Sequence, residues 1–302
     1  MNRILFNLVA AGTYALFLHS AGLDIGLLQQ VFSKPSAQSA VAIPIRLNDW
    51  ILADTVKVPC IVRNLSGITY CRWNQMLYAV SNQPPRLYTI TPSGACRREI
   101  ELTGFEDTEG VAVIGRNRFA ILEERRHSLS IVTIDDDTTQ VDRSEALHCL
   151  PLEIASQKNR GLEGIAFDDR RGRFYVAQEK RPRRIRSVHG WGEGQAPSHI
   201  GLERKLVPNR WLMNDISGLH FEDGSGCLLL VSDDSKCMVE MSLEGVLRGY
   251  VSLRRGACGL QKDIPKAEGI TLDDKGDLYI VSEPNLLYRF TRRLRPAAGE
   301  FT

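Results

Sequence analysis

Seven acidic residues recur at two fixed places within a repeated pattern of this 302-residue chain. The first place directly precedes a glycine that is followed by an aliphatic residue, and the second lies 14 or 15 positions after that glycine. Carboxylates gathered around one opening repel one another, so they stay ionised only beside a cation; otherwise several have raised pKa values. These acids are Glu109, Glu163 and Glu268 at the first place, and Glu124, Glu179, Asp233 and Glu283 at the second.

A bound calcium ion is the chemistry that such a set predicts. All of its ligands would be oxygen atoms, which suits Ca²⁺ because this ion takes about six to eight of them. Mg²⁺ fits less well, since it requires a small octahedral cage. Ser66 and Ser217 stand at the first place in the other two repeats, which leaves the ligand set open. The alternative is that some of these acids only cap strand ends and face water.

Other chemistries gain little support from the motifs. The sequence contains no G-x-S-x-G, Walker A or G-x-G-x-x-G element, which argues against serine-hydrolase, P-loop and Rossmann functions. The Asp-rich stretches, such as residues 273–276, lack EF-hand spacing and are predicted to be hairpin turns. The net charge of +2 argues against a nucleic-acid partner, because nucleic-acid binders usually carry a large basic excess.

The elements that position the acids repeat along the chain. The pattern is centred on five glycines, which lie 43, 54, 54 and 51 residues apart. Each glycine opens a short strand, which is followed by a turn, an apolar strand and a third strand. Short strands at this interval predict an all-β fold, namely a five-bladed β-propeller; a six-bladed ring with one degenerate blade is the alternative. The glycines are Gly67, Gly110, Gly164, Gly218 and Gly269.

This arrangement places both sets of acids at one mouth of the central channel. The path from the glycine to the second acid is one strand out, a turn and one strand back, so antiparallel pairing returns it to the same edge. The last repeat is short of its fourth strand, because only residues 291–302 follow the strand at 286–290. We expect residues 45–52 to supply that strand and to close the ring, which would remove an exposed sheet edge.

Residues 1–30 are predicted to be a membrane-targeting segment. The 20 positions between Arg3 and Asp24 carry no charge, which is close to the length that crosses a bilayer as a helix. An uncleaved signal-anchor is favoured over a cleaved signal peptide, because cleavage after Ala21 would put His19 at the −3 position. A buried helix of the soluble domain is the remaining alternative.

Residues 31–44 then read as a linker, and residues 45–302 as the propeller domain. The positive charge of Arg3 would keep the N-terminus in the cytoplasm. The propeller is therefore expected on the periplasmic, extracytoplasmic side of the inner membrane. Seven cysteines leave at least one thiol without a partner in the chain; Cys227 and Cys237, in neighbouring predicted strands, are the pair that would first be tested for a disulfide.

The sequence resembles the SdiA-regulated (YjiK-like) family of bacterial proteins. The resemblance covers roughly residues 45–291 and rests on the closing repeat at 267–290 and the leading segment at 65–70. It implies a five-bladed propeller, distantly related to NHL-repeat propellers, with a bound calcium ion and an extracytoplasmic, membrane-associated location. The calcium site that it implies falls chiefly on Glu109, Glu163 and Glu268, together with their second-strand partners.

Two functions are compatible with these features. The first is a non-enzymatic, membrane-tethered binding module for an unknown protein or envelope component. The alternative is a divalent-metal-dependent hydrolase of the lactonase or esterase kind, in which the ion acts as a Lewis acid. Glu124, Glu179 or Asp233 would then be the general base. The five repeats and the resemblance of the closing repeat favour the binding module, and the lack of a nucleophile–base motif is compatible with it.

Overall fold

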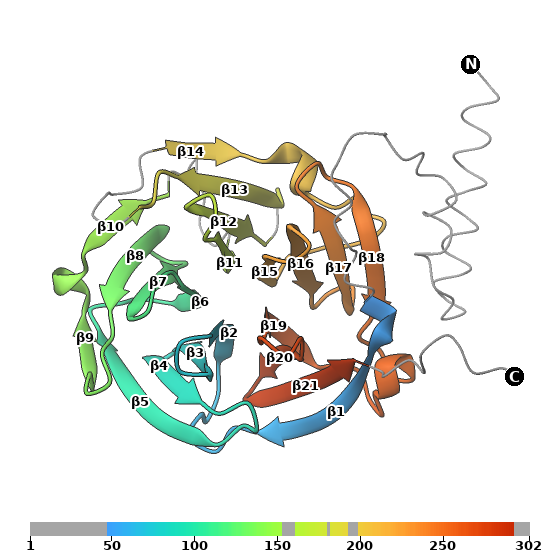
Figure 1. The fold of residues 1–302 in the computed structure, drawn as a ribbon, viewed down its shortest axis with the longest axis horizontal. Helices are drawn as coiled ribbons and strands as arrows, with labels where there is room; N and C mark the ends of the chain where they lie inside the picture. Colours follow the sequence, from blue (N-terminus) through green and yellow to red (C-terminus); the bar gives the residue numbers. More distant parts are fainter. Residues whose placement is uncertain (1–46, 153–160, 180–181, 193–198, 293–302) are drawn as a thin grey trace, which may run out of the picture.

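The computed structural model describes residues 47–152, 161–179, 182–192 and 199–292. Their 21 strands form five sheets, which are arranged as blades around a central axis (Figure 1). The five-bladed propeller is therefore confirmed, and the six-bladed alternative is wrong for this part of the chain. The targeting segment and linker predicted at 1–30 and 31–44 lie outside the described residues. None of the helices in the described ranges is long and apolar enough to span a membrane.

Each blade contains four antiparallel strands, and the chain runs from the axis to the rim (Figure 1). Blade 1 consists of β2 (Leu65–Cys71), β3 (Met76–Asn82), β4 (Pro85–Ile90) and β5 (Cys96–Thr103), with β9 (Gln140–Asp142) added in parallel at its outer edge. Blade 2 consists of β6 (Thr108–Val113), β7 (Arg118–Glu123), β8 (Ser128–Thr133) and β10 (His148–Pro151). Blade 3 consists of β11 (Leu162–Asp168), β12 (Arg173–Gln178), β13 (Arg184–His189) and β14 (His199–Leu202).

Blade 4 consists of β15 (Gly218–Glu222), β16 (Cys227–Ser232), β17 (Cys237–Ser242) and β18 (Leu247–Ser252). Blade 5 consists of β19 (Lys266–Leu272), β20 (Leu278–Glu283), β21 (Leu286–Arg292) and β1 (Trp50–Lys57). The described part also contains four short 3-10 helices, of which the first directly precedes β1 and the others lie between strands, at Leu47–Asp49, Arg143–Glu145, Arg204–Leu206 and Ala257–Gly259. The five inner strands, β2, β6, β11, β15 and β19, surround the axis (Figure 1).

The ring closes as the sequence predicts, with the N-terminal strand as the outermost strand of blade 5. β1 pairs antiparallel with β21, although it spans residues 50–57 rather than 45–52. Trp50 anchors this strand: its side chain is 1% exposed and its indole N–H donates to the carbonyl oxygen of Gly276 at 3.0 Å. The guanidinium of Arg292 lies 5.3 Å from the Trp50 ring centroid.

The repeated glycine is a packing requirement at the axis. A Cβ atom on Gly67 would lie 2.7 Å from the carbonyl oxygen of Glu109, and one on Gly218 would lie 2.9 Å from that of Glu268. Neighbouring inner strands therefore approach backbone to backbone, which only a residue without a side chain allows. The glycine that makes the repeat visible in the sequence is the residue that lets five strands meet.

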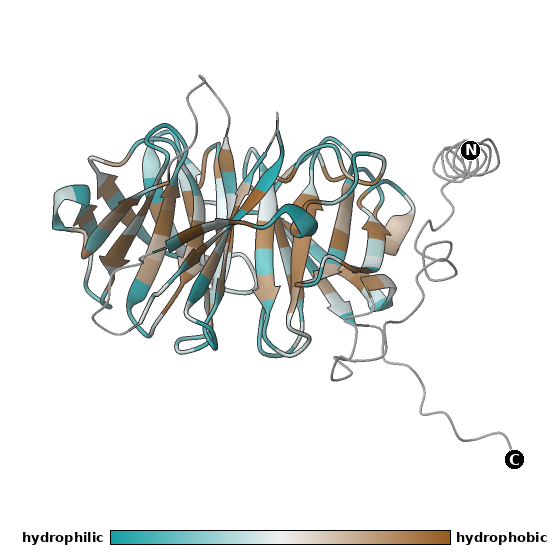
Figure 2. Cartoon of the chain, turned by 90° about the horizontal axis from the view of Figure 1, so that it is seen from above, coloured by the Kyte–Doolittle hydropathy of each residue, from teal (hydrophilic) through white to brown (hydrophobic). Residues whose placement is uncertain are grey.

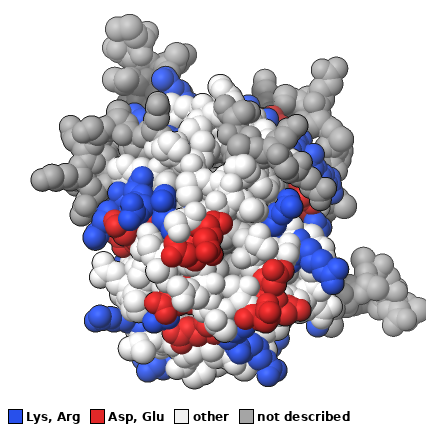
Figure 3. All heavy atoms as spheres, turned by 90° about the vertical axis from the view of Figure 1, so that its left-hand side faces the viewer, with Lys and Arg blue, Asp and Glu red and all other residues white. Residues whose placement is uncertain are grey.

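The apolar residues form five separate clusters, and each one lies between two adjacent blades. β16 is buried along its whole length because a neighbouring blade covers each of its faces. Figure 2 shows the hydrophobic residues concentrated on the strands and the hydrophilic residues at the loops of the two ends. On the side of the ring drawn in Figure 3, basic and acidic groups are interspersed.

The predicted pairing of Cys227 with Cys237 is wrong. Both thiols are buried and free, because Cys227 lies opposite Ser242 and Cys237 lies opposite Ser232, at the two ends of the β16–β17 ladder. At about 3.3 Å per residue, strand geometry keeps these ends far apart. The disulfide found in the described residues instead joins Cys60 to Cys96, with a Cα–Cα distance of 6.0 Å that is typical of a disulfide.

Candidate metal centre

The first set of acids occupies β-bulges at the start of the inner strands. In four blades the antiparallel register slips at the residue before the glycine, which leaves that residue unpaired in the ladder. A bulge re-aims a side chain locally. Glu163 and Glu268 consequently line a cavity of about 10 Å³ on the axis. The four bulged residues are Ser66, Glu109, Glu163 and Glu268.

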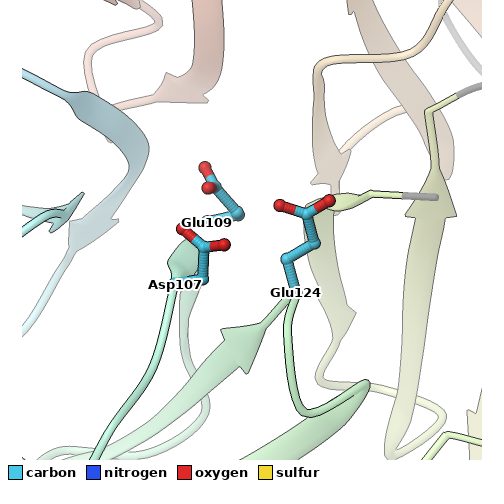
Figure 4. A group of neighbouring side chains, drawn as sticks. All are labelled: Asp107, Glu109 and Glu124. Carbon is cyan, nitrogen blue, oxygen red and sulfur yellow. The ribbon is translucent and has the colours of Figure 1, made fainter. Parts of the chain in front are cut away.

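The second set ends the neighbouring strands at the same mouth, as the strand arithmetic predicts. In blade 2 the closest group of carboxylates consists of Asp107, Glu109 and Glu124, whose nearest oxygen atoms all lie within 4.8 Å of one another. Figure 4 shows these three side chains at the start of β6 and the end of β7. The amide N–H of Glu124 donates to the carbonyl oxygen of Asp107 at 2.9 Å and holds the two loops together.

Asp107 is a member of this group that the sequence analysis missed. It lies three residues before the motif glycine and has a left-handed backbone, with φ of 55°. The corresponding residue is acidic in only one other repeat, at Asp215, and the others are Asn64, Gly161 and Lys266. The only signal in the sequence was therefore an acid two residues before Glu109, and no repeat pattern supported it.

Burial and mutual repulsion act on these carboxyl groups together. The pKa of Glu109 is raised to about 7, chiefly by burial and also by the charges of Glu124 and Asp107, although hydrogen bonds from Asn82 and Ser66 oppose the shift. Burial likewise raises the pKa of Glu124, with additional repulsion from Asp107 and Glu179. A carboxyl group in this state binds a proton readily and loses it when a cation arrives.

Glu163 lies at the electrostatic centre of the mouth. Burial raises its pKa well above the usual value, and the charges of Glu109, Glu268, Glu124 and Glu179 add to the shift. Blades 2 and 3, together with blade 5, thus direct acids at one another. The structure brings five of the seven predicted residues into this acidic mouth, namely Glu109, Glu124, Glu163, Glu179 and Glu268.

The remaining predicted residues, Asp233 and Glu283, are paired with lysines. Lys236 forms an ion pair with Asp233, which also accepts a hydrogen bond from the backbone of Ala267 at 3.3 Å. Lys266 lies 2.7 Å from a Glu283 oxygen and 3.1 Å from a Glu268 oxygen. Burial raises the pKa of Glu268 to about 8 in spite of this lysine.

The ligand atoms available at this mouth fit a hard cation. One observation beyond the acids is a buried amide oxygen: Asn82 donates from Nδ2 to Glu109 Oε1 at 2.9 Å, while its Oδ1 is buried with no hydrogen-bond partner. An oxygen left without a donor beside three carboxylates is suited to a cation, which needs acceptors only. The grouped donors are oxygen atoms, and neither imidazole nor thiolate is among them.

Comparison with known proteins places the chain in a family. The family model described as SdiA-regulated matches residues 49–291, which include all five blades. The chain belongs to the SdiA-regulated family. Among solved structures, it resembles a glutaminyl cyclase from Myxococcus xanthus, with a TM-score of 0.54 and 12% identity over 80% of this chain and 95% of that one. This similarity shows that the two proteins share the propeller fold.

A second similar structure is that of a nidogen/laminin complex, with a TM-score of 0.49 and 15% identity, covering 77% of this chain and 84% of that one. A streptogramin B lyase matches at a TM-score of 0.43 and 14% identity, over 81% of this chain and 68% of that one. A shared fold does not imply a shared function, so the function of the SdiA-regulated protein has to be argued from its own residues.

Proposed function

We propose that this SdiA-regulated protein is a membrane-tethered, extracytoplasmic propeller that binds Ca²⁺ at its acidic mouth and acts as a binding module. The observation that carries the metal is the group of Asp107, Glu109 and Glu124 with the unpartnered Oδ1 of Asn82 beside it. Ca²⁺ accommodates irregular sets of oxygen ligands, whereas Mg²⁺ demands a near-ideal octahedron.

The ion would act structurally on the ring. Asn82 belongs to blade 1, Glu109 and Glu124 to blade 2, and Glu163 to blade 3. In a metal-free ring these carboxyl groups must either hold protons or repel one another. A divalent cation would replace that repulsion with attraction and would join three neighbouring blades at one end of the axis.

The disulfide supports the extracytoplasmic location. Cys60 precedes β2 and Cys96 begins β5, so the bond ties the entry to blade 1 to its outer strand. Such bonds persist in oxidising compartments such as the periplasm and are rare in the cytosol. Together with the predicted targeting segment at 1–30, this supports a propeller tethered to the inner membrane on its periplasmic side.

The metal-dependent hydrolase is the alternative to a binding module. It requires an open coordination position on the ion and space for a substrate beside it. In the described residues, the cavity lined by Glu163 and Glu268 measures about 10 Å³, which is room for about one water molecule. The inner strands that meet at the glycines leave little space there. The packing at this mouth thus favours a structural ion.

Metal content and calcium affinity test the proposal directly. The protein would be purified without chelator, its metal measured by mass spectrometry, and the chelated protein titrated with CaCl₂ by calorimetry. We expect one tightly held Ca²⁺ per chain and at least about tenfold weaker binding after Glu109→Gln or Glu163→Gln. Glu145→Gln is the matched control, because Glu145 is exposed and lies in a 3-10 helix of blade 2 outside the mouth.

Absence of calcium in the purified protein, with no heat of binding on titration, would overturn the calcium site and the metal-dependent hydrolase together. Equal binding by the Glu109 variant and the Glu145 control would overturn this assignment of the ligands. If calcium binds as expected, assays with lactone and ester substrates then separate the two functions. Calcium-dependent turnover would replace the binding module with the enzyme.

A further inference from the structure

A second recess lies at the opposite end of the axis from the acidic mouth. It has a volume of about 530 Å³ and is lined by the ends of the inner strands and the hairpins that follow them in all five blades. Ile68, Ile165 and Leu219 line both this recess and the axial cavity on the acidic side. These aliphatic residues, which follow the motif glycines, form an apolar barrier that separates the two ends.

The size of the recess suits a small ligand, because pockets of roughly 300–1,000 Å³ are typical of small-molecule sites. Its rim carries both signs of charge, but several of these groups are engaged within the protein. Arg72 of blade 1 reaches to blade 3 and pairs with Asp169 at 2.9 Å. The Tyr70 hydroxyl donates to Asp274 at 3.2 Å, and Asp273 accepts from the backbone of its own turn at Lys275, at 2.9 Å.

Two polar groups in the recess remain without a full set of partners. Asp223 Oδ1 is buried with no hydrogen-bond partner, and burial raises the pKa of this carboxyl group. His220 lies deeper, and burial lowers its pKa to about 4, so its ring is neutral near pH 7. Its contact among the described residues is through Nδ1, 3.5 Å from Thr271 Oγ1. The carboxylate offers an acceptor, and a neutral imidazole can both donate and accept.

An aromatic surface completes the rim. Trp73 lies in the hairpin after β2 and is 45% exposed, which is high for so large an apolar side chain. The Arg72 guanidinium lies 4.9 Å from its ring centroid and limits its freedom on one side. An exposed indole beside hydrogen-bonding groups presents a flat apolar surface and a polar edge to one ligand.

We propose that this recess, which we call the hairpin-side recess, binds a neutral polyhydroxylated molecule of the size of a mono- or disaccharide. Hydroxyl groups both donate and accept, so they can satisfy the acceptor Asp223 and the neutral His220 together. The C–H face of a sugar ring can pack on Trp73. Arg72 and Lys275 at the rim would repel a cationic ligand, and the aspartates would repel an anionic one. The mixed charge therefore disfavours both kinds of charged ligand.

The site is separate from the proposed calcium site, and the two can be tested independently. Saturation-transfer NMR of the intact protein would use glucose, galactose, mannose, N-acetylglucosamine and a disaccharide of each. Glucosamine and glucuronate serve as cationic and anionic counterparts of the same ring. We expect at least one neutral sugar to bind with a Kd of about 1 mM or tighter. Its binding should not change on chelation or in the Glu109→Gln variant.

Variants of the rim locate the bound sugar. Trp73→Ala and Asp223→Asn should each weaken binding by roughly tenfold, the latter by loss of a charge-assisted hydrogen bond. Trp211→Ala is the matched control, because Trp211 is 80% exposed and does not line the recess. Thermal melting of each variant checks that the fold is retained.

Three outcomes would overturn the proposal. The first is that no neutral sugar in the panel shows saturation transfer. The second is that a sugar binds equally well to the Trp73, Asp223 and Trp211 variants, which would put it elsewhere. The third is preference for glucosamine or glucuronate over every neutral sugar, which would make the recess a site for a charged ligand.

Discussion

Replacing Glu109 by glutamine should stabilise the metal-free protein at alkaline pH and weaken its response to calcium. Glu109 is 6% exposed, and the pKa of its carboxyl group rises from 4.5 to about 7. A shift of this size corresponds to roughly 3 kcal/mol between the two protonation states. The substituted glutamine keeps the shape of the side chain and can still accept the hydrogen bond from Asn82, but it carries no charge to bury.

The effect of Glu109 on the free energy of unfolding changes with pH. Below about pH 4 the carboxyl group is protonated in both the folded and unfolded states, so it contributes nothing to stability. Between 4.5 and about 7 the folded state keeps the proton while the unfolded state loses it, and stability falls as pH rises. Above about pH 7 the full penalty of roughly 3 kcal/mol is present, and Glu109→Gln removes it. Calcium at 100 times its Kd should restore about 2.7 kcal/mol to the wild type.

Urea unfolding followed by tryptophan fluorescence measures both effects, in EDTA and in excess calcium, from about pH 5 to pH 8. In EDTA the variant should exceed the wild type by up to about 3 kcal/mol at pH 8 and by less than about 1 kcal/mol at pH 5. With saturating calcium the gap should narrow by about 1.4 kcal/mol for each tenfold difference in Kd between the wild type and the variant. Glu145→Gln is the control for loss of an exposed charge. A pH-independent gap, or equal stability at pH 8 in EDTA, would refute the burial argument.

Three further substitutions test a charge at the mouth, the packing at the axis and the disulfide. Lys266→Met should increase calcium affinity measured by calorimetry, because it removes the cation that lies 3.1 Å from Glu268; unchanged or weaker affinity would contradict this. Gly164→Ala should lower the free energy of unfolding by about 3 kcal/mol or more, because its Cβ would lie 2.9 Å from a backbone nitrogen of blade 4. An unchanged thermal melt would show instead that the strands at the axis can shift to make room. Cys96→Ser should lower the free energy of unfolding by roughly 4 kcal/mol, because the lost disulfide closes a 36-residue loop and so reduces the entropy of the unfolded chain. If the wild type has the same urea midpoint with and without reductant, the disulfide makes no such contribution.

The fold could be predicted because its signals are local and repeated. The glycine motif, the turn and the returning strand recur five times, so the strand count and the shared mouth follow from spacing alone. The closing strand was also predictable, because the last repeat is short of a strand and β1 supplies it. Antiparallel pairing carries such a pattern directly into space.

The acidic mouth was predictable only in outline. Spacing assigns acids to one edge of each blade, but it does not say which lysine reaches them. At the third position before the motif glycine, blade 2 carries Asp107, which adds to the group of carboxylates, and blade 5 carries Lys266, which pairs with Glu268 and Glu283. A single residue at a loop position thus decides whether a carboxylate is paired or left to a cation.

The sequence by itself determined the repeat, the number of blades and the mouth at which the acids gather, because each of these depends on contacts within one hairpin. Only the tertiary structure decided the partners of Cys60, the carboxylates that share an electrostatic field and the recess behind Ile68. The physical reason is that these features join residues of different strands or blades. Their distances depend on how five sheets pack around the axis, which no local spacing encodes.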